Sequence, residues 1–370
     1  MSPTQAYLAL NLVPKVGPVR ARRLVAALGS PEAVLRARKA ELTAVQGIGP
    51  EIAESLLRWE DHVDLAAEER KIADRGITIL TPADGNYPPL LKEIHDPPLA
   101  LYVWGTLRPE DRHAIGIVGS RRATHYGITC ARKFGYQLAS CGLAVVSGLA
   151  RGIDTAAHEG ALAAKGRTLA IIGSGIGKLY PPENQALAER IAENGAVISE
   201  FPVDYPPDKQ SFPLRNRIIS GWSSGILVVE APGRSGSLIT ANQAAEQGRS
   251  VYAIPGPIDR PGSEGPNRLI QDGARLVISA QDILDDLGSL FSRRELPGLG
   301  QGEATAPVAT PNLSAEESAA LKAIGDDESL LDDIAERSGL PVHVASTALL
   351  KLEMRRLVKQ LPGKYFVRLR

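Results

Sequence analysis

The chain has 370 residues, of which 44% are hydrophobic and 23% charged, ordinary values for a soluble globular protein of two or three domains. Its 42 basic and 42 acidic residues give a net charge of zero, so a nucleic-acid partner would need a local concentration of positive charge. No apolar run reaches the roughly 20 residues that span a bilayer and no signal peptide opens the sequence, so we expect a cytoplasmic protein without a membrane partner.

Residues 1–75 are predicted to form a helical domain. Segments 16–29 (VGPVRARRLVAALG) and 46–58 (QGIGPEIAESLLR) resemble each other, each being a glycine turn that leads into an amphipathic helix. This is a helix-hairpin-helix pattern, in which turn amides can contact DNA phosphates without reading bases. Three arginines in the first segment favour such contact, whereas the acidic residues of the second favour a simple packing module. Both interpretations stay open.

Residues 76–287 are predicted to form an extended Rossmann-like domain of the doubly wound α/β class. A proline-rich connector at 86–105 is expected to dock the helical domain onto it. Short apolar runs, typical of strands buried on both faces of a parallel sheet, then alternate with helical segments. The predicted strands are Ala114–Val118, Leu143–Ser147, Thr168–Ile172, Ala196–Ser199, Ile226–Val229, Val251–Ile254 and Leu276–Ile278.

Residues 288–312 are rich in Gly, Pro, Ala and Thr, which predicts a flexible linker. Residues 313–370 then have the order of a winged helix: helices, including 330–337 and 342–356, followed by a hairpin at 357–369. The expected recognition helix exposes His343, Ser346, Thr347 and Lys351, a poor set for reading bases. The terminal domains are candidates for contact with duplex DNA, or for contact with protein alone.

The turn after the first predicted strand, Gly119-Ser120-Arg121-Arg122, is the first candidate for ligand binding. It lies at the carboxyl end of a strand, where doubly wound folds bind ligands. Glycine turns before helices present backbone amides to phosphate, and arginine adds charge and forked hydrogen bonds. The spacing is not the GxGxxG of dinucleotide-binding proteins. We therefore expect Gly119, Ser120 and Arg121 to bind phosphate or a base, and we expect no cofactor.

Two later turns add candidates at the same edge of the sheet. Gly148 belongs to the turn after the second strand, and Lys178 follows a glycine loop after the third. Asp154 is a predicted N-cap for the helix that holds His158. An acid-base role for this pair is the alternative, but no Ser or Cys nucleophile completes it, and the cysteines and histidines lack metal-ligand spacing. The sequence therefore predicts no catalytic residue and no metal site.

Residues 208–217 (DKQSFPLRNR) hold the densest set of candidates. Cations that bind phosphates and aromatic faces that stack on bases are the groups that hold single-stranded nucleic acid. We expect Arg215 and Arg217 to lie on different faces of a helix, so that one can bind while the other forms an internal ion pair. The candidates in this segment are Lys209, Phe212, Arg215, Asn216 and Arg217.

Several long motifs in a fixed order resemble the bacterial DNA-processing protein A family (DprA, also called Smf). They include IVGSR, VSGLARGIDTAAH, LYPPEN, FPLRNRIISG and VVEAPGRSGSLITA, and they span almost the whole α/β domain. The resemblance implies a homodimeric protein that binds incoming single-stranded DNA, helps to load RecA recombinase during natural transformation, and catalyses no reaction. By the same resemblance, Arg121, Lys178 and Lys209 match the DNA pocket of the family.

Two other functions stay open. Phosphoribohydrolases of the same superfamily carry PGGxGTxxE, but here Thr240 stands in place of the glutamate, and only Glu230 lies nearby as a substitute. Such an enzyme would release free base from nucleoside monophosphates. Alternatively, the winged helix could make the protein a regulator that binds duplex DNA, a role that would survive loss of residues 76–287.

Overall fold

The computed structural model describes residues 1–288, 313–325, 329–354, 357–361, 363 and 365–368. The chain forms two compact units, which divide after Pro297. The linker predicted at 288–312 lies, apart from Gly288, outside the described residues. The exact domain boundaries stay predictions.

Seven helices form the amino-terminal region of the first unit. They are α1 (Pro3–Leu12), α2 (Pro18–Leu28), α3 (Pro31–Arg36), α4 (Lys39–Thr43), α5 (Pro50–Leu57), α6 (Trp59–His62) and α7 (Leu65–Asp74). The side chains of Ser2, Ser30 and Asp64 accept hydrogen bonds from first-turn amides of α1, α3 and α7. These amides have no partner within the helix, so such caps fix where each helix begins.

The predicted helix-hairpin-helix pair is present. Gly17 and Gly49 occupy the N-cap positions of α2 and α5, and a proline follows each of them. The two hairpins are neighbours, because Lys15 Nζ before the first lies 2.9 Å from a Glu51 carboxylate oxygen in the second. This ion pair also neutralises a cation beside the turns.

A nine-stranded mixed sheet forms the centre of the unit. The strands are β1 (Ile77–Leu80), β2 (Leu101–Gly105), β3 (Ala114–Val118), β4 (Ala144–Ser147), β5 (Thr168–Ile171), β6 (Ala196–Ser199), β7 (Gly225–Val228), β8 (Ser250–Ala253) and β9 (Arg275–Leu276). Their spatial order is β1-β2-β6-β5-β4-β3-β7-β8-β9. Strands β3, β4, β5 and β6 follow one another outward in the sheet. The chain then crosses back, and β7 pairs with the other side of β3. The strand order therefore reverses between β3 and β7, and open α/β sheets bind ligands at such a reversal.

All seven predicted strands are present, within two residues at each end. The connector at 86–105, whose prolines predict a break in regular structure, instead contains a short helix at Pro89–Glu93 and, in its last five residues, β2. The prolines end at Pro98, so the apolar residues after it can pair antiparallel with β6 and with the unpredicted strand β1. The helical region is thereby joined to the sheet by a strand as well as by packing.

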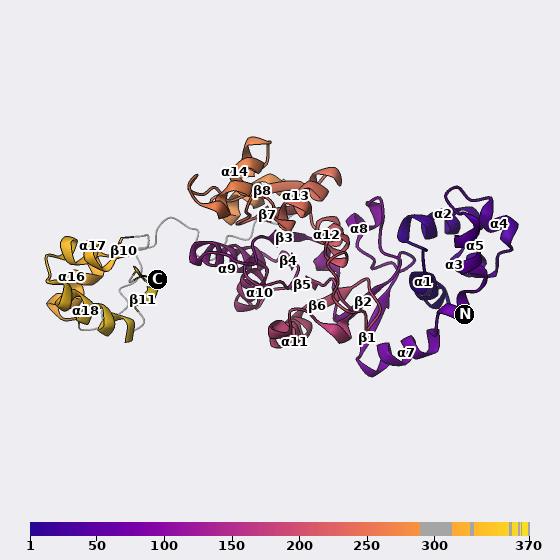
Figure 1. The fold of residues 1–370 in the computed structure, drawn as a ribbon, viewed down its shortest axis with the longest axis horizontal. Helices are drawn as coiled ribbons and strands as arrows, with labels where there is room; N and C mark the ends of the chain where they lie inside the picture. Colours follow the sequence, from indigo (N-terminus) through magenta and orange to yellow (C-terminus); the bar gives the residue numbers. More distant parts are fainter. Residues whose placement is uncertain (289–312, 326–328, 355–356, 362, 364, 369–370) are drawn as a thin grey trace. The chain divides into compact units, whose positions relative to one another are not determined.

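Helices cover both faces of the sheet (Figure 1). They are α8 (Pro89–Glu93), α9 (His125–Ser140), α10 (Ile153–Ala163), α11 (Gln185–Asn194), α12 (Ser211–Trp222), α13 (Gly236–Glu246), α14 (Glu264–Gln271) and α15 (Ala280–Leu287). Residues of α12 and α13 form one core with Val118, whereas α9 and α10 form another with Ile115 and Ile117. Alternate residues of β3 thus face opposite helical layers, which confirms the doubly wound class.

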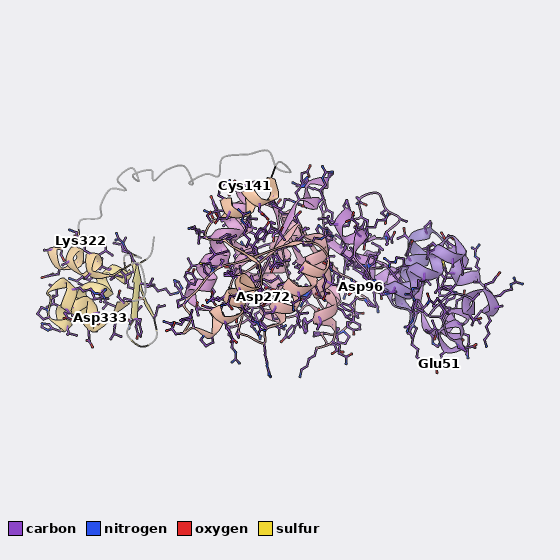
Figure 2. The ribbon with its side chains drawn as sticks, turned by 90° about the horizontal axis from the view of Figure 1, so that it is seen from above. Glu51, Asp96, Cys141, Asp272, Lys322 and Asp333 are labelled. Carbon is purple, nitrogen blue, oxygen red and sulfur yellow. The ribbon has the colours of Figure 1, made fainter. Side chains whose placement is uncertain are left out.

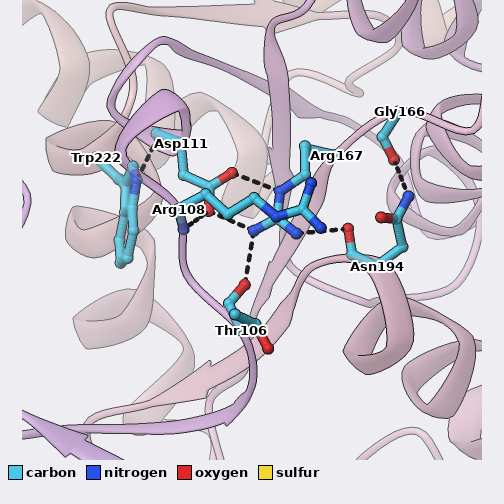
Figure 3. Close-up of polar contacts among 7 residues, drawn as sticks. All are labelled: Thr106, Arg108, Asp111, Gly166, Arg167, Asn194 and Trp222. Atoms are coloured by element: carbon cyan, nitrogen blue, oxygen red, sulfur yellow. Dashed lines mark hydrogen bonds and ion pairs between the residues drawn. The ribbon is translucent and has the colours of Figure 1, made fainter.

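A buried ion pair closes the sheet at the amino ends of its strands (Figure 3). Arg167 directly precedes β5, and its guanidinium donates from Nε and Nη2 to both carboxylate oxygens of Asp111, at 2.9 and 2.5 Å. The same guanidinium donates to the carbonyls of Thr106 and Asn194. The Trp222 indole donates to the Asp111 carbonyl. One arginine therefore joins the segment before β3 to β5 and to the end of α11.

The second unit is a winged helix, as predicted. Its elements are α16 (Ala315–Ala323), β10 (Ser329–Leu330), α17 (Leu331–Ser338), α18 (Val342–Met354), β11 (Val358–Leu361) and β12 (Tyr365–Arg368). Gly339 ends α17 in the left-handed conformation that favours glycine, with φ of 67°. Across the described residues of both units, no helix combines the length and apolar character needed to cross a membrane.

We expect Asp111→Ala to destabilise the first unit strongly. Removing one partner of a buried ion pair leaves the other charge uncompensated, which typically costs about 3–5 kcal/mol. The midpoint of thermal unfolding should therefore fall by several degrees. Asp61→Ala removes the exposed Arg58–Asp61 pair and should leave the midpoint unchanged. Equal midpoints for Asp111→Ala and the parent chain would contradict the closing role of this ion pair.

Candidate nucleic-acid interface

A pocket of about 590 Å³ opens at the carboxyl ends of β3 and β7, where the strand order reverses. Its wall is formed by the turn after β3, the start of α12, and the loop from β7 into α13. The cations that line it are Arg121, Arg122, Lys209, Arg215 and Arg234. Asp154 is the acidic residue among the lining residues. The pocket is therefore strongly cationic, although the chain as a whole is neutral.

Close backbone packing shapes the floor of the pocket. A Cβ atom at Gly119 would lie 2.5 Å from Ile153 Cγ1, and one at Gly152 would lie 2.3 Å from the Ser120 carbonyl oxygen. Gly152 also has a φ of 78°, which a residue with a side chain rarely adopts. The amide of Ser120 donates to the Glu230 carbonyl at 2.7 Å. Only glycine allows these turns to approach each other so closely.

Arg121 lies over the ring of Phe212, which is half-buried at the start of α12. Arg121 Cζ is 5.1 Å from the ring centroid, a cation–π distance. The Tyr180 ring approaches Phe212 from another side, with 6.0 Å between centroids. Phe212 therefore holds the exposed guanidinium of Arg121 against the pocket wall.

Arg215 lies deeper and is buried. Its Nη1 donates to the Ile171 carbonyl at 2.7 Å, and a Cβ atom at Gly148 would fall 1.6 Å from that nitrogen. Burial lowers the pKa of Arg215 to about 10, so the guanidinium remains positive at neutral pH. Burial also raises the pKa of Asp154, whereas the charge of Arg215 and hydrogen bonds from backbone amides act to lower that pKa. The floor of the pocket thus holds one opposed pair of charges.

Asp154 is not the N-cap of its helix, contrary to prediction. Gly152 occupies the N-cap position of α10. The Asp154 carboxylate instead accepts hydrogen bonds from the amides of Gly148 at 3.1 Å and Ala150 at 3.3 Å. It stabilises the turn before the helix, and the amide of Gly148 is consequently occupied within the protein.

The structure brings most of the predicted site residues together. Those that line the pocket are Gly119, Ser120, Arg121, Lys209, Phe212, Arg215 and Asn216.

Gly148, Lys178 and Arg217 are absent from the lining. Gly177, directly before Lys178, packs against Val203 and Asp204. A hydrogen bond from Lys71 lowers the pKa of Asp204, and the charge of Lys178 adds a smaller effect. Arg217 is buried and forms the internal ion pairs expected of one of the two arginines, to Glu200 at 2.5 Å and to Asp96 at 3.0 Å (Asp96 is labelled in Figure 2).

Two cations of the lining were missing from the predicted set. Arg122 directly follows Arg121, and Arg234 lies in the loop that follows β7. The signal for Arg234 was present in the sequence, since Pro232-Gly233-Arg234 also follows the carboxyl end of a predicted strand. The next residue, Ser235, caps α13, and the lining includes the first turn of this helix. The positive end of a helix dipole therefore adds to the cations.

The acid-base candidates form no catalytic group. His158 is fully buried, and its Nδ1 lies 2.7 Å from the Thr168 hydroxyl, which itself donates to a carbonyl. Burial lowers the pKa of His158 to about 3, so the imidazole is neutral. The Glu230 carboxylate accepts hydrogen bonds from the amide and hydroxyl of Thr124, the N-cap of α9. Within the described residues, no three His, Cys, Asp or Glu side chains are grouped to hold a metal ion.

Comparison with protein families gives three matches along the chain. Residues 78–288 match the model of DNA recombination-mediator protein A, residues 304–364 the DprA winged helix domain, and residues 7–58 a SAM-like helix-hairpin-helix tandem. The chain is 44% identical to the protein Smf of Escherichia coli over 79% of this chain and 77% of that protein. It is 35% identical to the Smf of Synechocystis over 98% of both.

Two solved structures are similar to that of this chain. The X-ray structure of DNA processing protein A from Streptococcus pneumoniae superposes with a TM-score of 0.68 and 33% identity, over 80% of this chain and 99% of that one. The protein of the same name from Helicobacter pylori superposes with a TM-score of 0.53 and 28% identity, over 58% of this chain and 98% of that one. The latter structure is described for its single-stranded DNA binding mode.

We expect buried His158 to make stability fall at acid pH. The imidazole stays neutral in the folded chain down to about pH 3, whereas the unfolded chain is protonated below about pH 6.5. Between these values the unfolded state binds more protons, so this residue lowers stability by up to about 1.4 kcal/mol per unit of falling pH. His158→Gln should show a shallower decline of the urea midpoint from pH 6 to pH 4. His62→Gln alters an exposed imidazole and should match the parent chain; equal slopes in all three would contradict this assignment.

Proposed function

This chain belongs to the DNA recombination-mediator protein A family, and on that premise we propose that it binds single-stranded DNA in the pocket between β3 and β7. We further propose that it helps to load RecA recombinase onto the bound strand in the cytoplasm, during natural transformation or other recombination, and that it catalyses no reaction. The observation that carries the proposal is the set of cations that line the pocket. The binding of single-stranded DNA by the Helicobacter pylori relative supports the same ligand.

The charge of the exposed cations in the lining is available to a ligand. Within the described residues, no ion pair involves Arg121, Arg122, Lys209 or Arg234. All four are exposed, whereas Arg215 is buried and faces Asp154. The lining thus combines four exposed cations with a single carboxylate, that of Asp154. Phosphate groups are the matching ligand.

Arg121 and Phe212 together offer a stacking surface. A planar guanidinium stacks on nucleic-acid bases, and here it is positioned by Phe212, whose ring centroid lies 5.1 Å from Arg121 Cζ. We propose that a base stacks on the other face, while Lys209 and Arg234 bind the phosphates on either side. The first turn of α13 contributes backbone amides to the same phosphates.

The pocket favours single strands over duplex. Bases reach an aromatic or guanidinium face only when they are unpaired and splayed out. The contacts involve phosphates and stacking, with Asn216 as the principal amide that could pair with a base edge. We therefore propose little sequence preference.

The phosphoribohydrolase alternative lacks a catalytic carboxylate in the pocket. Thr240 lines the pocket where that motif has glutamate, and the Glu230 carboxylate is engaged by the amide and hydroxyl of Thr124. Asp154, the carboxylate that is present, is held by two backbone amides and by the charge of Arg215. These contacts support binding without glycosidic cleavage.

The regulator alternative depends on α18 of the winged helix. This helix exposes His343, Ser346, Thr347 and Lys351, as the sequence predicts, but Lys351 is the sole cation of that set. The Thr347 hydroxyl already donates to the His343 carbonyl. Duplex contact by this unit would rest on few groups, so we propose that it is secondary to the pocket.

We propose that the homodimer forms through the edge of the sheet at β9. This strand ends the sheet, and an uncovered edge readily pairs with another chain. Leu276 on the strand is 47% exposed, Ile278 just after it is 72% exposed, and Ile258 after β8 is 98% exposed. Large exposed apolar side chains on and near the last strand of a sheet fit a protein interface.

Arg121→Ala should weaken binding of a 20-nucleotide oligothymidine by about ten- to hundredfold, because it removes a charged contact worth about 1.5–3 kcal/mol. Fluorescence anisotropy at two salt concentrations measures this, and the salt dependence should also become shallower. Arg190→Ala is a matched control, since Arg190 is exposed on α11 and outside the pocket lining. Lys178→Ala should behave like that control. An Arg121→Ala variant that binds as tightly as the parent chain would refute the proposed pocket.

Leu276→Asp combined with Ile278→Asp should convert the dimer to a monomer, because charges would be buried at the paired edge. Sedimentation equilibrium measures the mass. Affinity for a long single strand should fall through lost avidity, while affinity for a strand that fills one pocket should persist. A variant that remains dimeric would place the interface elsewhere.

A further inference from the structure

Helix α9 carries an exposed stripe of tyrosines and cations that begins at the pocket. Arg122, which lines the pocket, precedes the helix by three residues, and Tyr126, Lys133 and Tyr136 follow along it. The spacings of seven and three residues bring Tyr126, Lys133 and Tyr136 to one face of the helix. Tyr126 is 51% exposed and Tyr136 42%, and both cations are exposed.

The opposite face of α9 is fully used by the fold. Ala131, Phe134 and Leu138 pack in the core cluster against β3 and α10. The tyrosines of the stripe therefore add nothing to this core. Large aromatic side chains on a solvent-facing stripe are better explained by a ligand than by folding.

The charge of the stripe fits a polyanion. Helix α9 contains no Asp or Glu in its sixteen residues, whereas α11, another surface helix of the same layer, has Glu189 and Glu193 beside Arg190. Arg132, next to the stripe, is the cation of α9 that a carboxylate neutralises, through Glu159. Cations alternating with aromatic rings are the pattern that binds single-stranded nucleic acid.

We propose that the strand held in the pocket continues along α9, with bases stacked on Tyr126 and Tyr136 and a phosphate bound by Lys133. This inference rests on the proposed function and extends its binding site. The two tyrosines are ten residues apart, which is about 15 Å along the helix axis. At a stacked rise of about 3.4 Å per nucleotide, the stripe holds up to about four nucleotides beyond the pocket. Figure 2 labels Cys141, the residue that ends this helix.

The test measures, by fluorescence anisotropy, the affinity of the full chain for a series of oligothymidines of about 4 to 20 nucleotides. The triple variant Tyr126→Ala, Lys133→Ala, Tyr136→Ala should bind long strands at least about thirtyfold more weakly, since it removes two rings that each stack on a base. It should bind the shortest strands as the parent chain does. As the strand is lengthened, the affinity of the triple variant should reach its maximum at a shorter length than the affinity of the parent chain does.

Two further variants separate the contributions. Tyr126→Phe with Tyr136→Phe keeps the rings and should retain full affinity, which also shows that loss in the triple variant is loss of stacking. Arg70→Ala with Arg190→Ala removes two exposed cations, on α7 and α11, and should have no effect on the length dependence.

Arg121→Ala separates failure of this inference from failure of the proposed function. If Arg121→Ala weakens all lengths and the triple variant weakens none, the pocket stands and the path along α9 is refuted. If neither weakens binding, the proposed function fails as well. If the triple variant instead changes the sedimentation mass with DNA binding intact, the stripe is a protein interface and the inference is overturned.

Discussion

The pocket depends on the passage of one arginine beneath a glycine. The Arg215 side chain runs under the Gly148 turn to reach the Ile171 carbonyl, and any side chain at position 148 would occupy the same space. The turn is held in place by Asp154, which accepts the Gly148 amide and faces the charge of Arg215. A buried arginine is stable only with such compensation. This arrangement fixes the floor of the pocket. The exposed cations Arg121, Arg122, Lys209 and Arg234 lie around that floor.

Charge is distributed unevenly for a physical reason. Structural arginines such as Arg167 and Arg217 are buried and need carboxylates, which Asp111 and Glu200 supply. The exposed cations of the pocket lining are hydrated, so they are stable without an ion-pair partner and can bind a polyanion. The same chain can therefore be neutral overall and cationic at one edge of its sheet. Binding there should depend on salt, as counterion release requires.

The sequence predicted the sheet and part of the pocket, and the reasons are specific. Strands such as β3 and β6 are short apolar runs between turns, so their positions follow from the pattern alone. Arg121 was found because a turn after a buried strand must lie at the carboxyl edge. Lys178 was selected by the same reasoning, but it is absent from the pocket lining, and the neighbouring Gly177 packs against Val203 and Asp204, a contact that local pattern does not encode. Arg234 follows β7 in the same way and lines the pocket, although it was missing from the predicted set. The role of Asp154 depends on a turn geometry that one sequence does not reveal.

Photochemical crosslinking of a single strand would test the binding site most directly. A 20-nucleotide strand carrying 5-iodouracil would be irradiated with the full chain, and the crosslinked peptides would be identified by mass spectrometry. If the pocket holds the strand, crosslinks should fall on the peptides around Phe212 and Arg121, and excess unlabelled single strand should remove them more efficiently than duplex. Crosslinks confined to α18 of the winged helix, removed equally well by duplex, would contradict single-strand binding in the pocket.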